Sequence, residues 1–513
     1  MQPDQIALEY KNDKISYQNL LLQIKKFAHA VISSGLPGQS RIGVFLPKQP
    51  ETVIAMFGTM AAGACIVPIN PALKPQQVKH ILNDCAVSIL ITSPTRLQHL
   101  SGIIHQCSAL KKIVITDNLI PEQEYSLPIT SWNSFYCDQE TELAQPEEKD
   151  VAAIFYTSGS HGKPKGVVLT HSNLAIGAES VAQYLRLSEQ DRILAVLPLS
   201  FDYGFSQLTS GFLKGASVVL LDYLFPKDVI HAVDKYRITG LAGIPTLWHQ
   251  LADIAWPEHI KQHLRYITNS GALFSEKLIR HYRHLLPSTD IYLMYGLTEA
   301  FRSTYLEPDQ IDKRPRSIGK AIPNAEIVII NEYNKECQPE ETGELVHVGP
   351  LVAQGYWNNA EDTKRRFRPL PPSVNSKYGH SQAAVWSGDL VKKDSEGYMY
   401  FISRRDDMIK TSGYRVSPEE IEQSILEIDC VQECAVFSVP HEELGQSIVA
   451  IVTGKDRHSL TAGKLSARLK QTLPGYMVPR KFIITDDLSV GVNGKVDKNM
   501  LHAEYDSAFS DTE

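Results

Sequence analysis

The stretch that decides the fold reads Tyr156-Thr-Ser-Gly-Ser-His-Gly-Lys-Pro-Lys-Gly166. An apolar segment with the composition of a strand precedes it, and residues 173–184 after it have helical character. Its glycines, hydroxyls and two lysines predict a loop whose backbone N–H groups surround phosphate oxygens. No Gly-Lys is followed by Ser or Thr, so the loop is not a Walker A motif, and His161 after Ser160 excludes a Gly-x-Ser-x-Gly nucleophile elbow. Taken alone, such a stretch is more often an ordinary loop.

Working outward, strand-sized apolar segments alternate with helical stretches over most of the N-terminal part. The predicted strands are 41–45, 65–68, 88–92, 112–116, 152–156, 217–221 and 266–269. This alternation favours parallel sheets covered by helices. A β-rich stretch follows from Glu326 to about Tyr400, with residues 369–376 expected to form a surface loop. The predicted class is α/β, or α+β overall.

A change in composition near Ser403 predicts a domain boundary. Residues 403–407 are densely charged, and a compact order of helix, strand, helix, strand is expected beyond them, with a helix opening at Pro418. We therefore expect a large N-terminal body, residues 1–402, and a small C-terminal domain, residues 403–513.

Composition excludes several classes of protein. The chain has 513 residues, 43% of them hydrophobic and 21% charged, which is typical of a folded globular protein of roughly three folding units. With 51 Lys and Arg against 58 Asp and Glu the net charge is −7, so bulk electrostatic binding to nucleic acid or to an anionic membrane is not expected. No signal peptide, membrane-spanning run, disulfide framework or zinc-type cysteine spacing is recognised, which favours a cytoplasmic protein.

Four further motifs follow the loop in a fixed order. They are Tyr295-Gly-Leu-Thr-Glu299, Ser387-Gly-Asp-Leu390, the run from Arg404 to Arg415, and Asn493-Gly-Lys-Val-Asp-Lys498. With these five motifs the sequence resembles the adenylate-forming superfamily: acyl-CoA synthetases, luciferases and the adenylation domains of non-ribosomal peptide synthesis. The resemblance covers nearly the whole chain, from Tyr17 to about Leu501.

The resemblance implies a reaction and a nucleotide site. These enzymes join a carboxylate to the α-phosphate of ATP, release pyrophosphate and pass the acyl group to a thiol, so they must neutralise oxygen charge and fix an in-line geometry. Thr298 and Glu299 match positions that touch the α-phosphate and hold Mg²⁺, and Tyr295 matches the ring on which adenine stacks. The other implied nucleotide contacts are Thr157, Ser158, Gly159, Ser160, Lys165, Gly271, Ala272, Gly296, Asp389, Phe401 and Arg404.

The C-terminal domain carries the implied catalytic lysine. Lys495 matches the ammonium that bridges the incoming carboxylate and the α-phosphate. In this family the small domain rotates between the two half-reactions, and Asp406 matches its hinge. Gly413 matches a position in the tunnel for the thiol arm, or is a turn glycine. The chain departs from the family pattern at His161, usually Thr, at Ser403, usually Gly, and at Phe401, where some relatives have Tyr.

Asp202 bears on the acid that is activated. It lies in Ser200-Phe-Asp-Tyr-Gly-Phe205, where amino-acid adenylating enzymes place the Asp that binds the substrate's ammonium. A buried Asp needs a cationic partner, so the segment favours an amino acid; a helix cap or a protein Arg is the alternative. The remaining implied pocket residues are Tyr203, Ser206, Thr268, Ser270, Met294, Arg302 and Ser303.

The resemblance to standalone enzymes predicts a partner. It favours an amino acid, proline-like, loaded onto the phosphopantetheine of a separate carrier protein in natural product biosynthesis, with ATP and Mg²⁺ as cofactors. Similarity along 199–223 and 292–308 to exosortase-associated AMP-forming acyl-CoA ligases keeps a non-amino acid and CoA open as the alternative. A nucleotide-binding homologue that has lost catalysis is the third possibility.

Overall fold

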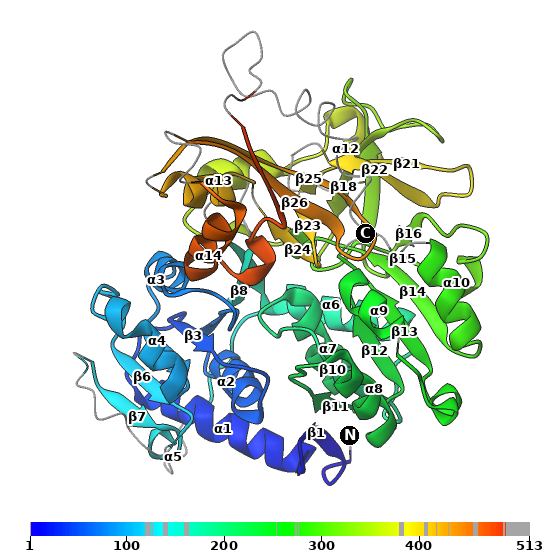
Figure 1. Ribbon diagram of the computed structural model, residues 1–513. Coiled ribbons are helices and arrows are strands. Elements are labelled where there is room, and N and C mark those ends of the chain that lie inside the picture. The colour runs from blue at the N-terminus through cyan, green and yellow to red at the C-terminus, as the bar shows by residue number, and fades with distance from the viewer. Residues whose placement is uncertain are drawn as a thin grey trace.

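The computed structural model places most of the chain in one large body and a smaller C-terminal unit (Figure 1). It describes residues 2–117, 125, 127–136, 142–157, 164–252, 254–271, 274, 276–378, 384–404, 409–416, 418–428, 430–454, 460–485 and 488. The predicted class, mixed α/β with a large body of sheets and a small C-terminal domain, is confirmed. No helix in these ranges is both long and apolar enough to cross a membrane.

An eight-stranded sheet forms one half of the large body, in the order β19-β9-β8-β4-β3-β5-β6-β7. Its strands are β3 (Arg41–Phe45), β4 (Cys65–Pro68), β5 (Ile89–Thr92), β6 (Lys112–Ile115), β7 (Ile129–Ser131), β8 (Val151–Thr157), β9 (Lys165–Thr170) and β19 (Gly355–Tyr356). The helices of this part of the chain are α1 (Tyr17–Ser33), α2 (Pro50–Ala61), α3 (Pro75–Asp84), α4 (Pro94–Ile104) and α5 (Trp132–Phe135). β3 to β7 pair in parallel, and every residue of β4 and β5 is buried. Burial on both faces explains why these strands are continuous apolar runs.

A 14-stranded sheet forms the other half, in the order β17-β18-β21-β22-β16-β15-β14-β13-β12-β10-β11-β1-β2, with β20 paired to β21. Its strands are β1 (Ile6–Tyr10), β2 (Asp13–Ser16), β10 (Arg192–Ala195), β11 (Ser217–Leu220), β12 (Gly240–Gly243), β13 (Tyr266–Asn269), β14 (Asp290–Tyr295), β15 (Thr304–Leu306), β16 (Ser317–Ala321), β17 (Glu326–Ile330), β18 (Gly343–Val348), β20 (Phe367–Arg368), β21 (Ala384–Lys393) and β22 (Met399–Arg404). The helical elements are α6 (His171–Tyr184), α7 (Asp202–Leu213), α8 (Pro226–Lys235), α9 (Pro245–Ala252), α10 (Glu276–Leu285), α11 (Ala360–Arg366), α12 (Pro372–Tyr378) and the 3₁₀ turns η1 (Glu258–Gln262), η2 (Thr298–Ala300) and η3 (Pro308–Gln310).

The C-terminal unit, orange to red in Figure 1, has its own sheet and core. Its elements are β23 (Ile409–Thr411), β24 (Tyr414–Val416), α13 (Pro418–Leu426), β25 (Val431–His441), β26 (Gly445–Gly454), α14 (Ala462–Thr472), η4 (Gly475–Met477) and β27 (Lys481–Ile484). β22 runs on to Arg404 within the large sheet, two residues past the expected division at 402/403. That division stays a prediction.

Two local expectations are wrong. Residues 369–376 are not all loop, because α12 begins at Pro372, where proline suits the first turn, and buries Val374 against a cluster with Trp386. In the C-terminal unit the order from α13 onward is helix, strand, strand, helix, strand, rather than helix, strand, helix, strand. The His441 imidazole accepts the backbone N–H groups of Glu443 and Leu444, which closes a tight turn between β25 and β26.

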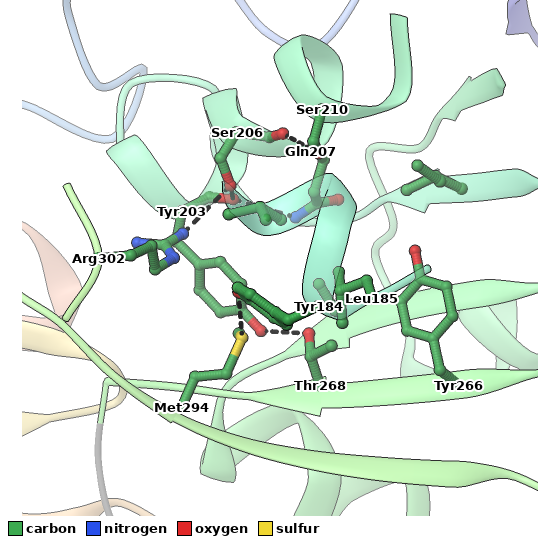
Figure 2. Close-up of a pocket in the computed structure, with 13 residues that line it drawn as sticks. Tyr184, Leu185, Tyr203, Ser206, Gln207, Ser210, Tyr266, Thr268, Met294 and Arg302 are labelled. Atoms are coloured by element: carbon green, nitrogen blue, oxygen red, sulfur yellow. Dashed lines mark hydrogen bonds between the residues drawn. The ribbon is translucent and has the colours of Figure 1, made fainter. Parts of the chain in front are cut away.

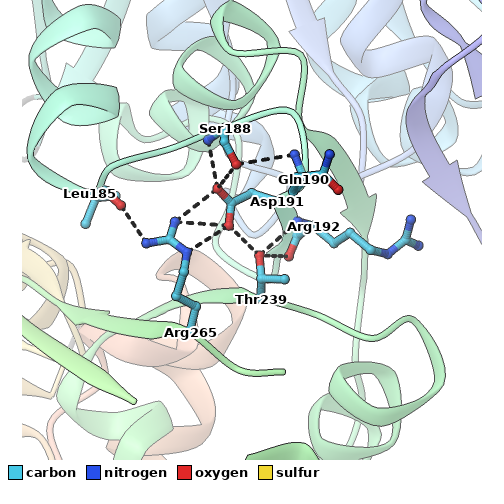
Figure 3. A network of polar contacts seen from close by, with 7 residues as sticks. All are labelled: Leu185, Ser188, Gln190, Asp191, Arg192, Thr239 and Arg265. Carbon is cyan, nitrogen blue, oxygen red and sulfur yellow. Dashed lines mark hydrogen bonds and ion pairs between the residues drawn. The ribbon is translucent and has the colours of Figure 1, made fainter. Parts of the chain in front are cut away.

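A partly buried ion pair links the amino ends of three parallel strands (Figure 3). Asp191, 2% exposed, precedes β10 and accepts hydrogen bonds from Arg265, which precedes β13, at 3.0–3.1 Å. The Thr239 hydroxyl, before β12, donates to the same carboxylate at 2.7 Å. The opposite, carboxyl ends of these strands are thereby held in register, and in parallel sheets those ends are where ligands bind.

The C-terminal unit packs against the large body through aromatic rings, glycines and one buried carboxyl group. Tyr414 meets Phe201 edge-on, with ring centroids 5.1 Å apart. Glu420 on α13 accepts a hydrogen bond of 3.2 Å from Gln77 on α3. Burial raises the pKa of Glu420 to about 7, although the bond from Gln77 lowers it.

Glu420 makes stability depend on pH. The pKa of Glu420 in the folded protein lies above the unfolded value of 4.5. Its contribution to the free energy of unfolding is therefore complete below pH 4.5 and is lost as pH rises through about 7. Between pH 5 and 8 the free energy of unfolding should fall on the order of 2 kcal/mol from this group. Glu420→Gln should remove that part of the slope in urea titrations, whereas Glu427→Gln, at an exposed position, should keep it. Equal slopes in wild type and Glu420→Gln would contradict the assignment.

Candidate active site

The predicted site residues come together at the carboxyl ends of the parallel strands. Asp202 and Tyr203 follow β10, Ser270 and Gly271 follow β13, and Thr298 follows β14. Chain segments far apart in sequence therefore meet at one edge of the large sheet. This edge is where open α/β sheets bind their ligands.

Tyr295 and Asp389, two predicted nucleotide contacts, touch directly. The Tyr295 hydroxyl donates to Asp389 Oδ2 at 2.5 Å, and both side chains are buried. Asp389 on β21 lies opposite Arg404 on β22 in the strand register. Phe401, also on β22, is partly exposed beneath the ammonium of Lys410, 4.5 Å from its ring centre. The structure thus gathers these four predicted residues on three strands of one sheet, β14, β21 and β22.

Glu299 presents one free carboxylate oxygen. It is 8% exposed, and its Oε1 accepts a hydrogen bond of 2.7 Å from the Tyr356 hydroxyl. Its Oε2 is buried and has no hydrogen-bond partner among the described residues. The Ala353 N–H donates to the Glu299 carbonyl at 2.8 Å, so the segment leading into β19 holds both backbone and side chain. Sequence reasoning missed Tyr356, whose Gly-Tyr setting carries no recognised signal.

The phosphate loop closes an antiparallel hairpin. Thr157 at the end of β8 pairs with Lys165 at the start of β9, so the loop leads into a strand, and α6 begins only at His171. Strand β9 therefore separates the loop from the helix N-terminus in the sequence. Lys165 forms an ion pair of 2.6 Å with Asp362. Burial raises the pKa of Asp362, but the hydrogen bond from Lys165 and its positive charge lower this pKa further, to below its usual value. Lys165 accordingly braces the hairpin against α11.

Asp202 has a protein partner. Arg302, with 3% of its side chain exposed, donates to Asp202 Oδ2 at 2.7 Å, and Thr298 donates to Oδ1 at 3.3 Å. Asp202 also stands in the first turn of α7, where a negative charge is favourable. The structure thus shows the alternative that the sequence left open, in which Asp202 meets a protein Arg at the start of a helix.

A small cavity of about 20 Å³ lies beside this ion pair (Figure 2). Of the eight predicted pocket residues, the five that line it are Tyr203, Ser206, Thr268, Met294 and Arg302. Asp202, Ser270 and Ser303 lie nearby but do not line it. Its other polar and aromatic lining residues are Tyr184, Gln207, Ser210 and Tyr266, and no motif in the sequence marks them.

Hydrogen bonds fix most of these side chains. The hydroxyls of Tyr203 and Thr268 lie 2.6 Å apart, and Tyr184 donates to the sulfur of Met294 at 3.0 Å. Behind the cavity, Ser303 bonds to Nδ1 of His347 at 3.0 Å. Burial lowers the pKa of His347 to about 3, so this imidazole is neutral at pH 7.

Three predicted glycines lie where backbones approach closely. A Cβ on Gly413, whose φ is +78°, would lie 2.8 Å from Ile244, and one on Gly271 would lie 3.3 Å from the Cα of Gly413. Gly296 faces the backbone of Arg302 in the same way, at 3.1 Å. Several predicted residues lie outside the described ranges: Ser158, Gly159, Ser160, Ala272, Asp406 and Lys495, and the His161 departure with them.

The site fits a nucleotide carrying a hard cation. The buried, unpartnered oxygen of Glu299 is the ligand type that Mg²⁺ prefers. Within the described part of the chain no three His, Cys, Asp or Glu side chains gather around one point. A cation held by Glu299 would therefore take its other ligands from phosphate oxygens and water, as Mg²⁺ commonly does.

Comparison with known proteins gives the family. Residues 1–357 match the AMP-binding enzyme family, and residues 420–495 match the AMP-binding enzyme C-terminal domain. The chain belongs to the AMP-binding enzyme family. This match confirms the family that the motifs predicted.

Relatives of two kinds are similar to this ligase. Tyrocidine synthase 1 of Brevibacillus parabrevis is 28% identical over 97% of this chain, and the long-chain-fatty-acid–CoA ligase of Bacillus subtilis is 27% identical over 98% of it. The chain spans 92% of the CoA ligase but only 43% of tyrocidine synthase 1, and 6–13% of three larger peptide synthase components. Sequence similarity of this level does not separate amino acids from other acids.

Solved structures confirm the fold. A double mutant of the o-succinylbenzoate CoA synthetase of Bacillus subtilis, bound with its product analogue OSB-NCoA, is 24% identical, with a TM-score of 0.83 and coverage of 98% of this chain and 96% of that one. The o-succinylbenzoate CoA synthetase of the same organism in complex with its acyl-adenylate intermediate OSB-AMP covers the same shares and has a TM-score of 0.69.

We expect Tyr356→Phe to weaken the binding of Mg²⁺, so that catalysis needs a higher Mg²⁺ concentration. The variant removes the donor that orients Glu299 while preserving the ring, and loss of such outer partners typically costs 10–100-fold in metal affinity or activity. The Mg²⁺ concentration for half-maximal AMP formation should rise roughly tenfold. Tyr333→Phe, at a residue 73% exposed, should leave it unchanged. A lower maximal rate at an unaltered Mg²⁺ midpoint would contradict this role for Tyr356.

Proposed function

We propose that this ligase activates a small carboxylic acid without an α-ammonium group as its acyl-adenylate and then transfers the acyl group to a phosphopantetheine thiol. The observation that carries the proposal is the identity of the charged residue beside the cavity. Arg302 lines it, whereas Asp202 stands behind Arg302 and is already paired. An ammonium entering the cavity would meet a cation first.

For the first half-reaction, the described residues provide binding and orientation. We propose that Asp389 accepts hydrogen bonds from the ribose hydroxyls and that Tyr295, in contact with Asp389, stacks on the base. Thr298, next to Glu299 in the chain and bonded to Asp202, is our proposed contact to the α-phosphate. Mg²⁺ held by Glu299 would neutralise phosphate charge, and we propose that Lys495 brings a second positive charge to the reacting oxygens.

For the second half-reaction, we propose that the small unit presents Gly413 to the thiol arm. The close approach of Gly413 to Gly271 supports this, because neither of the two residues that meet there has a side chain. Asp406 remains our proposed hinge. Coenzyme A and a carrier protein present the same arm.

Amino-acid activation is the second candidate, with a proline-like substrate loaded onto a separate carrier protein. The Phe201-Asp202 pair and the peptide synthase relatives favour it. The ion pair opposes it, because an ammonium would have to share Asp202 with Arg302 at 2.7 Å.

The test is carboxylate-dependent ATP–pyrophosphate exchange with matched pairs of acids. Each amino acid, proline included, is compared with the same acid lacking its amino group, and AMP is measured as product. We expect exchange with the deaminated acids. Exchange with amino acids alone would establish the second candidate, and nucleotide binding without exchange across the panel would indicate a homologue that has lost catalysis.

Lys495→Ala should separate the two half-reactions. Loss of the bridging ammonium should reduce pyrophosphate exchange by about 100-fold or more, within the range seen when one stabilising group is removed. Thiolation from a supplied acyl-adenylate should fall far less. Lys498→Ala, in the same motif, serves as the matched control. Equal losses in both half-reactions would contradict the role of Lys495.

A further inference from the structure

Arg302 is held rigidly beside the cavity with part of its hydrogen-bonding capacity unspent. Its Nη1 donates to Asp202 at 2.7 Å and to the Phe301 carbonyl at 2.8 Å, and its Nη2 donates to the Ser206 hydroxyl at 3.2 Å. The plane of the guanidinium is further held by the Tyr203 ring, 4.7 Å away. A guanidinium has five N–H donors, so two of them have no acceptor among the described residues.

Gln207 offers the complementary group from α7. It lines the same cavity, is 6% exposed, and its Oε1 is buried without a hydrogen-bond partner in the described part of the chain. Its Nε2 reaches only the Tyr203 carbonyl, at 3.4 Å. Among the described residues, the cavity thus has hydrogen-bond donors on Arg302 and an acceptor on Gln207 that lack partners. Figure 2 shows both residues in the cavity lining.

The remaining wall limits the size and charge of what can enter. Tyr203 and Thr268 bond to each other, and Tyr184 bonds to Met294, so these groups are already satisfied. A volume of about 20 Å³ corresponds to roughly one water molecule, which admits only a short tail. Because Asp202 balances the charge of Arg302, an ionised group on that tail would be an unpaired buried charge, which is costly.

We propose that Arg302 and Gln207 select a short acid whose tail carries an uncharged group that both accepts and donates a hydrogen bond, of which a hydroxyl is the smallest. Its oxygen accepts from the Arg302 guanidinium, and its hydrogen is donated to Gln207 Oε1, directly or through one bridging water. This assignment rests on the proposed activation of a non-amino acid and names the class of that acid.

The experiment compares kcat/KM for pyrophosphate exchange among acids of equal chain length. The set contains butyrate, pentanoate and hexanoate, those of their 3-, 4- and 5-hydroxy derivatives that each chain length allows, and the corresponding dicarboxylates, terminal amino acids and α-amino acids. A site built to bond a hydroxyl rejects the analogue lacking it strongly, so we expect at least one hydroxy acid to exceed its parent by about 100-fold. Parent acids equal to or better than all hydroxy acids would overturn the inference while leaving the proposed function intact. Exchange with α-amino acids alone would overturn both.

Gln207→Leu supplies the matched variant, because it removes the acceptor and leaves the ion pair of Arg302 in place. The preference for the hydroxy acid over its parent acid should fall about tenfold or more. Gln183→Leu, the same substitution at an exposed position of α6, should preserve the preference. An unchanged preference in a Gln207→Leu protein with wild-type thermal midpoint would overturn the assignment.

Discussion

The ion pair between Asp202 and Arg302 organises the site. It joins the first turn of α7 to the segment that follows η2, two parts of the chain 100 residues apart. A buried charge pair is stable only when both partners are present and well bonded, so it holds both segments in one geometry. Thr298 bonds to Asp202 and Ser206 bonds to Arg302, so a continuous chain of hydrogen bonds runs from Thr298 to the cavity.

A second ion pair, between the buried Asp191 and the partly exposed Arg265, holds the opposite ends of the same parallel strands. Between the two pairs, apolar side chains pack against both faces of the strands. Close-packed interiors of this kind have low compressibility, so the strands form a rigid support. The loops at the carboxyl ends can therefore be placed accurately. Glu299 receives the same support from Tyr356, in a segment braced by Lys165 and Asp362.

The contact between the large body and the C-terminal unit has a different character. Glycine backbones, aromatic rings and one carboxyl group of raised pKa meet there. Contacts of these kinds can separate and re-form at lower cost than buried charge pairs, because fewer desolvated charges are left behind. This suits a family in which the small domain is expected to rotate between half-reactions.

The fold and the motif-bearing residues were largely predictable. Apolar runs such as 65–68 and 266–269 become strands where expected, because burial on both faces leaves a continuous hydrophobic signal. Tyr295 and Asp389 were predicted for one site and are in contact. Helix α12 was missed because its hydrophobic contact, Val374 with Trp386, is invisible in a stretch rich in proline. Thus the order of motifs and the alternation of strands and helices determined the class of protein. Only the tertiary structure decided that the cation of Asp202 is Arg302, that Tyr356 orients Glu299 and that Gln207 faces the cavity, because contacts between residues far apart in the chain depend on how segments pack.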